Sequence, residues 1–164
     1  MVPAELIERA AAVAVRLENR GETLAVAESA AGGLISAALV AVPGASAFYR
    51  SGLVIYTLDG AQALLPRAPR LSPDIRGASE PFARWLATAA AGALRTDWGL
   101  GETGAAGPAG NPYGDPPGHA WVAVRGPGGR TSARHVLTGS DDRPRNMAAF
   151  AEAALALLLR ELAD

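Results

Sequence analysis

The sequence contains neither cysteine nor lysine. Without cysteine the chain forms no disulfide, carries no thiolate nucleophile and offers no thiolate ligand to a metal ion. All fifteen basic residues are arginine. Because a guanidinium group stays protonated at physiological pH, arginine does not act as a general base. Mechanisms that depend on cysteine or on lysine are therefore excluded.

Aromatic residues, net charge and long apolar runs are also scarce. Aromatics make up 5% of the 164 residues and hydrophobic residues 49%, so the core must consist mainly of Ala, Val, Leu and Ile. A formal net charge of −1 argues against a surface for nucleic acid or anionic membrane. No apolar run reaches the roughly 18 residues that a bilayer span needs, and Glu5 and Glu8 are atypical of a signal peptide. We expect a cytoplasmic protein that binds neither nucleic acid nor membrane.

Helical and strand patterns alternate along the chain, with two adjacent strands near its end. Apolar spacing and capping residues predict helices, and short apolar runs predict strands. This alternation predicts one domain over residues 1–164, a three-layer α/β/α sandwich around a mixed β-sheet. Long loops are expected over 66–78 and 103–118, and the final hairpin offers an edge through which a homo-oligomer could form. The predicted helices span 3–20, 31–41, 59–65 (stopping at Pro66), 79–95 and about 142–162, and the predicted strands span 24–27, 52–57, 97–102, 119–125 and 131–137.

The first candidate site is the turn at Ser29, between a predicted strand and a predicted helix. Backbone N–H groups at a helix start bind anions, and Gly32 and Gly33 would let a ligand approach closely. Ser29 adds a hydroxyl group beside Glu28. The segment therefore predicts either a small-molecule site or an ordinary serine cap in front of a helix.

The second candidate is the glycine-rich segment that holds Thr103, Gly104 and Gly107. It follows a predicted strand, and ligands of α/β sheets lie beyond strand ends. Such a composition is typical of a phosphate or polar-ligand cradle, or of a flexible connection. Tyr56, at a predicted strand end, is either a catalytic or ligand-binding hydroxyl or a half-buried packing residue. Arg145 opposes the dipole in the first turn of the last helix, so it either binds an anionic ligand or is solvated.

The sequence carries little that predicts a metal or a cofactor. His119 and His135 share no metal-ligand spacing with each other or with nearby acids, and we interpret both as structural or exposed. Neither a dinucleotide-binding fingerprint nor a P-loop is present. We therefore expect no metal and no cofactor.

These segments, in this order, resemble the CinA C-terminal domain family, which includes the stand-alone nicotinamide mononucleotide deamidases. The resemblance covers roughly residues 5–160, and several motifs in order make it specific. The matching segments are Ala27–Ser29 with Gly32–Gly33, Val42–Ser46, Gly52–Tyr56, Gly77–Glu80, Thr103–Gly104 with Ala106–Pro108, Pro117–Gly118 and Trp121.

The resemblance implies an α/β/α fold and hydrolysis of the carboxamide of nicotinamide mononucleotide to nicotinate mononucleotide and ammonia, without a metal. It implies that Ser29 is the nucleophile and that a lysine five residues after the strand-end tyrosine activates it. We expect Tyr56 to be the second catalytic residue. A serine hydroxyl needs such a base at neutral pH. Residues expected to bind the substrate are Glu28, Gly32, Gly33, Ser46, Thr103, Gly104, Gly107 and Arg145.

The chain departs from this pattern at the base. Ala61 stands five residues after Tyr56, and no lysine elsewhere can replace it. Three alternatives remain open. The protein is an amidase in which Tyr56, Glu28 or a water-bridged Asp59 takes the base role; it is a nucleotide-binding or regulatory homologue with impaired catalysis; or it is a different hydrolase that acts on a related ligand.

Overall fold

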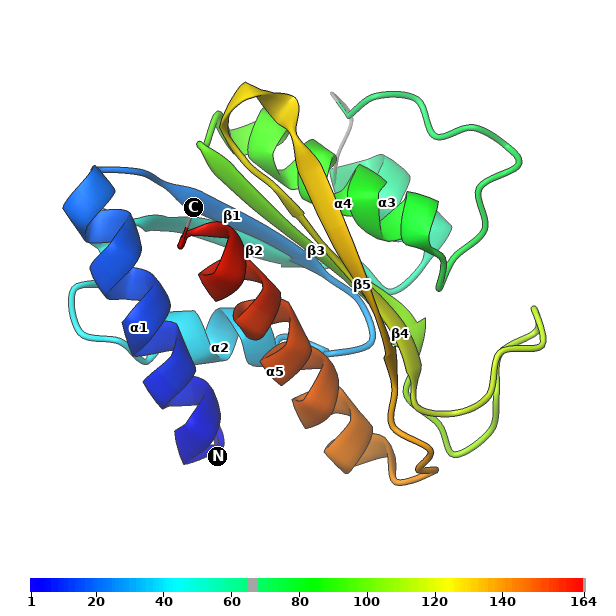
Figure 1. Cartoon of the computed structure of the whole chain (residues 1–164). Coiled ribbons are helices and arrows are strands. Elements are labelled where there is room, and N and C mark those ends of the chain that lie inside the picture. Colours follow the sequence, from blue (N-terminus) through cyan, green and yellow to red (C-terminus); the bar gives the residue numbers. More distant parts are fainter. Residues whose placement is uncertain (65–67, 164) are drawn as a thin grey trace.

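A five-stranded sheet forms the centre of the computed structural model, which describes residues 1–64 and 68–163 (Figure 1). The strand order is β2-β1-β3-β4-β5. Strand β1 pairs in parallel with β2 and β3, whereas β4 is antiparallel to both of its neighbours. The predicted mixed sheet is therefore confirmed. The strands are β1 (Leu24–Glu28), β2 (Tyr49–Val54), β3 (Trp98–Ala105), β4 (His119–Arg125) and β5 (Thr131–Leu137).

Helices cover both faces of this sheet, as the three-layer prediction requires (Figure 1). One face packs against α1 (Ala4–Arg20), α2 (Leu34–Val40) and α5 (Arg143–Glu161). The other packs against α3 (Leu58–Leu64) and α4 (Glu80–Leu94). Two short 3-10 helices, η1 (Ala45–Ala47) and η2 (Pro127–Gly129), lie in the connections. No helix of the described ranges is long and apolar enough to cross a membrane.

Small residues let the layers approach closely. Gly99 and Gly101 lie on the face of β3 that carries α4, and a Cβ atom at either position would overlap a backbone carbonyl oxygen of that helix. Helix α4 itself buries five alanines. The two fully buried phenylalanines, Phe48 and Phe150, fill the core on the opposite face. Because glycines and alanines face each other between β3 and α4, the two elements pack closely without large aromatic side chains between them.

Most predicted helix ends are confirmed by their caps. Helix α1 ends at Gly21, which has a left-handed φ of 63°. Helix α4 begins after Ser79, whose Oγ accepts the N–H of Phe82 at 3.4 Å. Helix α5 begins after Asp142, whose Oδ1 accepts the N–H of Arg145 at 3.1 Å.

Three boundaries near the candidate site differ from the prediction. Strand β2 starts at Tyr49, paired with Leu24, and ends at Val54, so Tyr56 lies beyond the strand. Strand β3 continues to Ala105 because its last residues pair with the start of β4; Thr103 and Gly104 are therefore strand residues and not loop residues. The helix after Ser29 begins at 34, since turns occupy the residues before it. The predicted helix end at Pro66 lies outside the described residues.

Candidate functional site

The Ser29 turn lies at the carboxyl end of β1, where two adjoining hollows meet. The first, of about 250 Å³, is lined by Ser29, Tyr56, Thr103 and Gly104 among others. The second, of about 450 Å³, shares Ser29, Tyr56 and Gly104 with the first and adds Gly107. We call these two hollows together the Ser29 pocket. The fold thus brings five of the predicted site residues to one place.

Arg143, which the sequence did not single out, also lines the Ser29 pocket. Its Nη1 donates to the carbonyl oxygen of Gly107 at 2.6 Å, and its Nη2 donates to the hydroxyl of Tyr56 at 2.7 Å. Tyr56 is 64% exposed, so these contacts lie at the mouth of the pocket. Arg143 is the first residue of α5, two positions before the predicted Arg145. Its place in the first turn of this helix was the feature of the sequence that could have indicated a role in the site.

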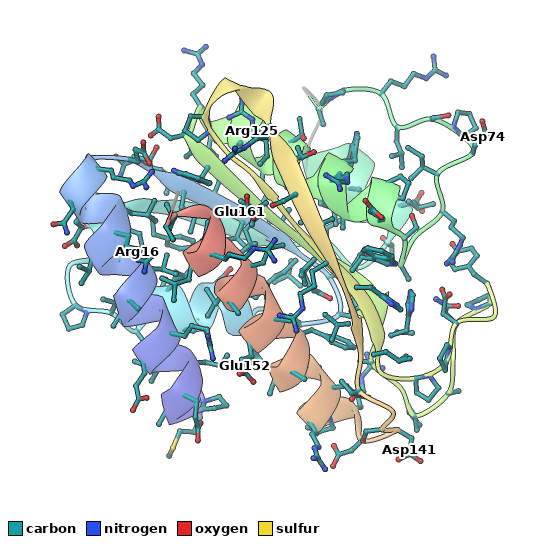
Figure 2. The ribbon with its side chains drawn as sticks, in the orientation of Figure 1. Arg16, Asp74, Arg125, Asp141, Glu152 and Glu161 are labelled. Carbon is teal, nitrogen blue, oxygen red and sulfur yellow. The ribbon has the colours of Figure 1, made fainter. Side chains whose placement is uncertain are left out.

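Arg145 and Ser46 do not line the Ser29 pocket, and their role in substrate binding stays a prediction. Arg145 lines a separate hollow with Asp141 and Glu152, both labelled along the α5 side of Figure 2. Ser46 is exposed in η1, which precedes the amino end of β2. Strands β1 and β2 are parallel, and Ser46 precedes β2 whereas Ser29 follows β1. The two serines therefore lie at opposite ends of these strands.

Glu28 is fully buried and serves as a cap for α2. Its Oε2 accepts the N–H groups of Gly33 at 2.9 Å and Ile35 at 3.1 Å. Its Oε1 accepts both the N–H and the hydroxyl of Ser36, at 3.0 and 2.5 Å. With four donors bound, this carboxylate neither lines the pocket nor lies free to act as a base.

A second buried carboxyl group, Glu102 on β3, holds the Ser29 turn from the other side. Its Oε2 accepts the N–H of Ser29 at 3.0 Å and that of Ala31 at 2.8 Å. Its Oε1 is buried and has no hydrogen-bond partner among the described residues. Burial raises the pKa of Glu102 to about 7, the negative charge of Glu28 adds to the rise, and the backbone N–H groups of the turn oppose it. Glu102 was not among the residues predicted for the site; its one signal in the sequence is a charged side chain inside a buried strand.

These two carboxyl groups change the expected role of the turn. The N–H groups of Ser29, Ala31 and Gly33 are bound by protein side chains. The N–H of Gly32 donates to the carbonyl oxygen of Ser29 at 3.1 Å. The N–H groups that an anion would need at this helix start are therefore already bound by the chain's own carboxyl groups.

Glycines allow the shape of the turn and of the loop opposite. Gly32 and Gly33 have φ angles of 65° and 99°, and a Cβ atom at Gly32 would lie 2.7 Å from Met147 Cε. Gly107 has a φ of 107°, and a Cβ atom there would lie 2.9 Å from the carbonyl oxygen of Asp141. Gly107 lines the Ser29 pocket, so a side chain there would displace its wall, whereas Gly32 and Gly33 do not line the pocket and shape the turn itself.

Polar contacts tie the remaining wall of the pocket together. The hydroxyl of Thr103 accepts the N–H of Ala78 at 3.1 Å. Arg76 binds Asp115 through two hydrogen bonds of 2.6 and 3.1 Å, and this contact lowers the pKa of Asp115. Together they connect the loop after β3 to the segment before α4.

The two histidines form a contact with each other beside this wall. His119 is 6% exposed, and its Nε2 lies 2.8 Å from the carbonyl oxygen of Ala78. Its Nδ1 lies 2.9 Å from Nε2 of His135, an exposed residue of β5. The described residues hold no group of three or more His, Asp or Glu side chains placed to bind a metal ion.

The described residues place no base in hydrogen-bond contact with Ser29. Within the described part of the chain, its hydroxyl makes no hydrogen bond that meets ordinary geometry. Ala61 is 2% exposed on α3 and packs in an apolar cluster with Ala27 and Phe82. Asp59, the third candidate base, is exposed on the same helix. The catalytic roles of Ser29 and Tyr56 stay predictions.

The fold and the site together define an α/β/α protein with a serine at a strand-to-helix turn above a mixed sheet. The chain belongs to the CinA C-terminal domain family, whose sequence model matches residues 7–162. A CinA-like protein of Anaeromyxobacter sp. (strain Fw109-5) is 44% identical over 143 residues, which cover 87% of this chain and 35% of that protein. The chain thus spans about a third of the length of the curated relatives that it matches.

Solved structures of the same superfamily share the fold. A competence-damaged protein (CinA) superfamily protein from Klebsiella pneumoniae 700603 matches with a TM-score of 0.88 and 28% identity, over 96% of this chain and 98% of that one. A competence/damage inducible protein from Agrobacterium tumefaciens matches with a TM-score of 0.89 and 27% identity, over 100% and 99%. The α/β/α prediction is therefore confirmed at the level of the whole chain.

Proposed function

We propose that the Ser29 pocket binds nicotinamide mononucleotide and that this chain hydrolyses the carboxamide far more slowly than a family member with the expected lysine. One observation carries the proposal: among the described residues, no hydrogen bond joins the hydroxyl of Ser29 to a group that could take its proton. Loss of an activating base typically lowers a rate by several orders of magnitude.

Arg143 supports the nucleotide assignment. Its guanidinium group lies at the mouth of the pocket, where it can pair with a phosphate through two parallel hydrogen bonds. The turn at Ser29 does not bind the phosphate in this proposal, because Glu28 and Glu102 already accept hydrogen bonds from its N–H groups. The phosphate is therefore assigned to the Arg143 end, and the pyridine ring to the end lined by Ser29 and Thr103.

The candidate bases support slow hydrolysis. Glu28 binds four donors, and the Tyr56 hydroxyl accepts a hydrogen bond from a permanently charged arginine. Glu102 contacts the N–H of Ser29 from below the turn and does not line the pocket. Ala61 stands where the family resemblance implies the lysine that activates the serine.

Ammonia release from nicotinamide mononucleotide tests the proposal. The wild-type chain should release ammonia slowly or not at all. Ala61→Lys should gain release, and the double change Ala61→Lys with Ser29→Ala should lose that gain. Fast release by the wild-type chain that Ser29→Ala abolishes would contradict the proposal and would establish an amidase with a different base.

A further inference from the structure

The second buried carboxyl group of the Ser29 turn has no place in the proposed binding scheme, although it touches the predicted nucleophile's own backbone. Glu102 is 0% exposed and comes from β3, a different strand from the one that carries Ser29. It receives two hydrogen bonds from the turn through one oxygen, while its other oxygen has no partner among the described residues. A buried polar atom without a partner is costly, so its retention needs an explanation.

The two carboxyl groups beneath the turn divide it between them. Glu28 binds the far part, at Gly33, Ile35 and Ser36, and Glu102 binds the near part, at Ser29 and Ala31. Glu28 therefore fixes the start of α2. Glu102 fixes where the chain leaves β1, and this is the point from which the Ser29 side chain enters the pocket.

We propose that Glu102 is a positioning residue for Ser29: its carboxyl group ties the N–H groups of Ser29 and Ala31 to β3, and the gain or loss of its proton shifts the Ser29 side of the pocket and its affinity for the nucleotide. The second half of this statement rests on the proposed function.

Among the described residues, one ionisable group is found to act on Glu102. Glu28, from β1, is the charged group that acts on it. Strand β4 places Val122 opposite it, α2 carries no ionisable residue, and α5 presents Asn146 and Phe150 to the core. With its proton, Glu102 is a neutral acceptor beside the Glu28 carboxylate. Without it, two negative charges lie under the turn, and the hydrogen bonds to Ser29 and Ala31 become charge-assisted and shorter.

Amide NMR of the whole ¹⁵N-labelled chain, followed from pH 5 to pH 9, tests the first half. The resonances of Ser29 and Ala31 should move together, with one midpoint near the pKa of about 7. Glu102→Gln keeps an acceptor oxygen of the same shape but cannot ionise, so this shared titration should vanish. Glu8→Gln, on the exposed side of α1, should leave it unchanged. Persistence of the titration in Glu102→Gln would overturn the assignment.

Calorimetric titration with nicotinamide mononucleotide over the same pH range tests the second half. The affinity of the wild-type chain relative to Glu102→Gln should rise several-fold as pH rises through 7, because the new negative charge lies under the end of the pocket assigned to the positively charged pyridinium ring. A constant ratio, with the amides still titrating, would reduce Glu102 to a purely structural role and overturn the inference. Failure of the nucleotide to bind either protein would refute the proposed function, while the amide titration would still decide how Ser29 is held.

Discussion

Glu102→Gln should change the pH dependence of folding stability. A carboxyl group whose pKa is raised on folding prefers its neutral form in the folded state, so the stability tied to its proton is complete below the unfolded pKa of 4.5 and is lost as pH rises through about 7. At about 1.4 kcal/mol for each pH unit, that interval corresponds to about 3 kcal/mol. Glutamine has no ionisable proton, so the free energy of unfolding of Glu102→Gln should not include this loss with rising pH.

Urea unfolding between pH 4.5 and pH 8 measures the effect. The free energy of unfolding of Glu102→Gln minus that of the wild-type chain should rise by about 3 kcal/mol over this range and level off above pH 7. Glu8→Gln controls for the general loss of one carboxylate, since Glu8 is exposed. A difference that stays constant with pH would refute the argument that burial keeps Glu102 neutral in the folded protein.

Three further changes follow from the packing and the polar contacts. Gly101→Ala should lower the free energy of unfolding by about 1–3 kcal/mol, because the new methyl group meets the backbone of α4; urea unfolding measures this, and an unchanged midpoint would contradict the close approach of β3 and α4. Asp115→Asn should speed amide hydrogen exchange in the loop after β3 by removing the ion pair with Arg76, and equal exchange rates would show that this contact does not hold the loop. Ala61→Lys should lower the melting temperature, because position 61 is 2% exposed. The same burial should lower the pKa of the new lysine below its ordinary value. An unchanged melting temperature would mean that the ammonium group reaches solvent.

The sequence was sufficient for the layers, the sheet type and most of the pocket. Apolar spacing and capping residues such as Gly21 and Ser79 act locally, so their pattern predicts helix ends correctly. Strand β3 was predicted too short because its last residues are held by pairing with β4, a contact distant in sequence. Glu102 could not be assigned for the same reason: its partners, Ser29 and Ala31, lie more than 70 residues away.

The choice between two arginines of α5 was also beyond the sequence. Arg143 and Arg145 are two residues apart and are therefore turned well away from each other around the helix. Only the packing of α5 decides which of them meets the pocket, and it selects Arg143.

Calorimetric titration of nicotinamide mononucleotide into three proteins tests the central claim, that the Ser29 pocket is a nucleotide site with its phosphate end at Arg143. The wild-type chain should bind, Arg143→Gln should bind about tenfold more weakly or worse through the loss of charge-assisted hydrogen bonds, and Arg145→Gln should match the wild-type chain. Equal binding by the wild-type chain and Arg143→Gln, or a loss confined to Arg145→Gln, would contradict the account.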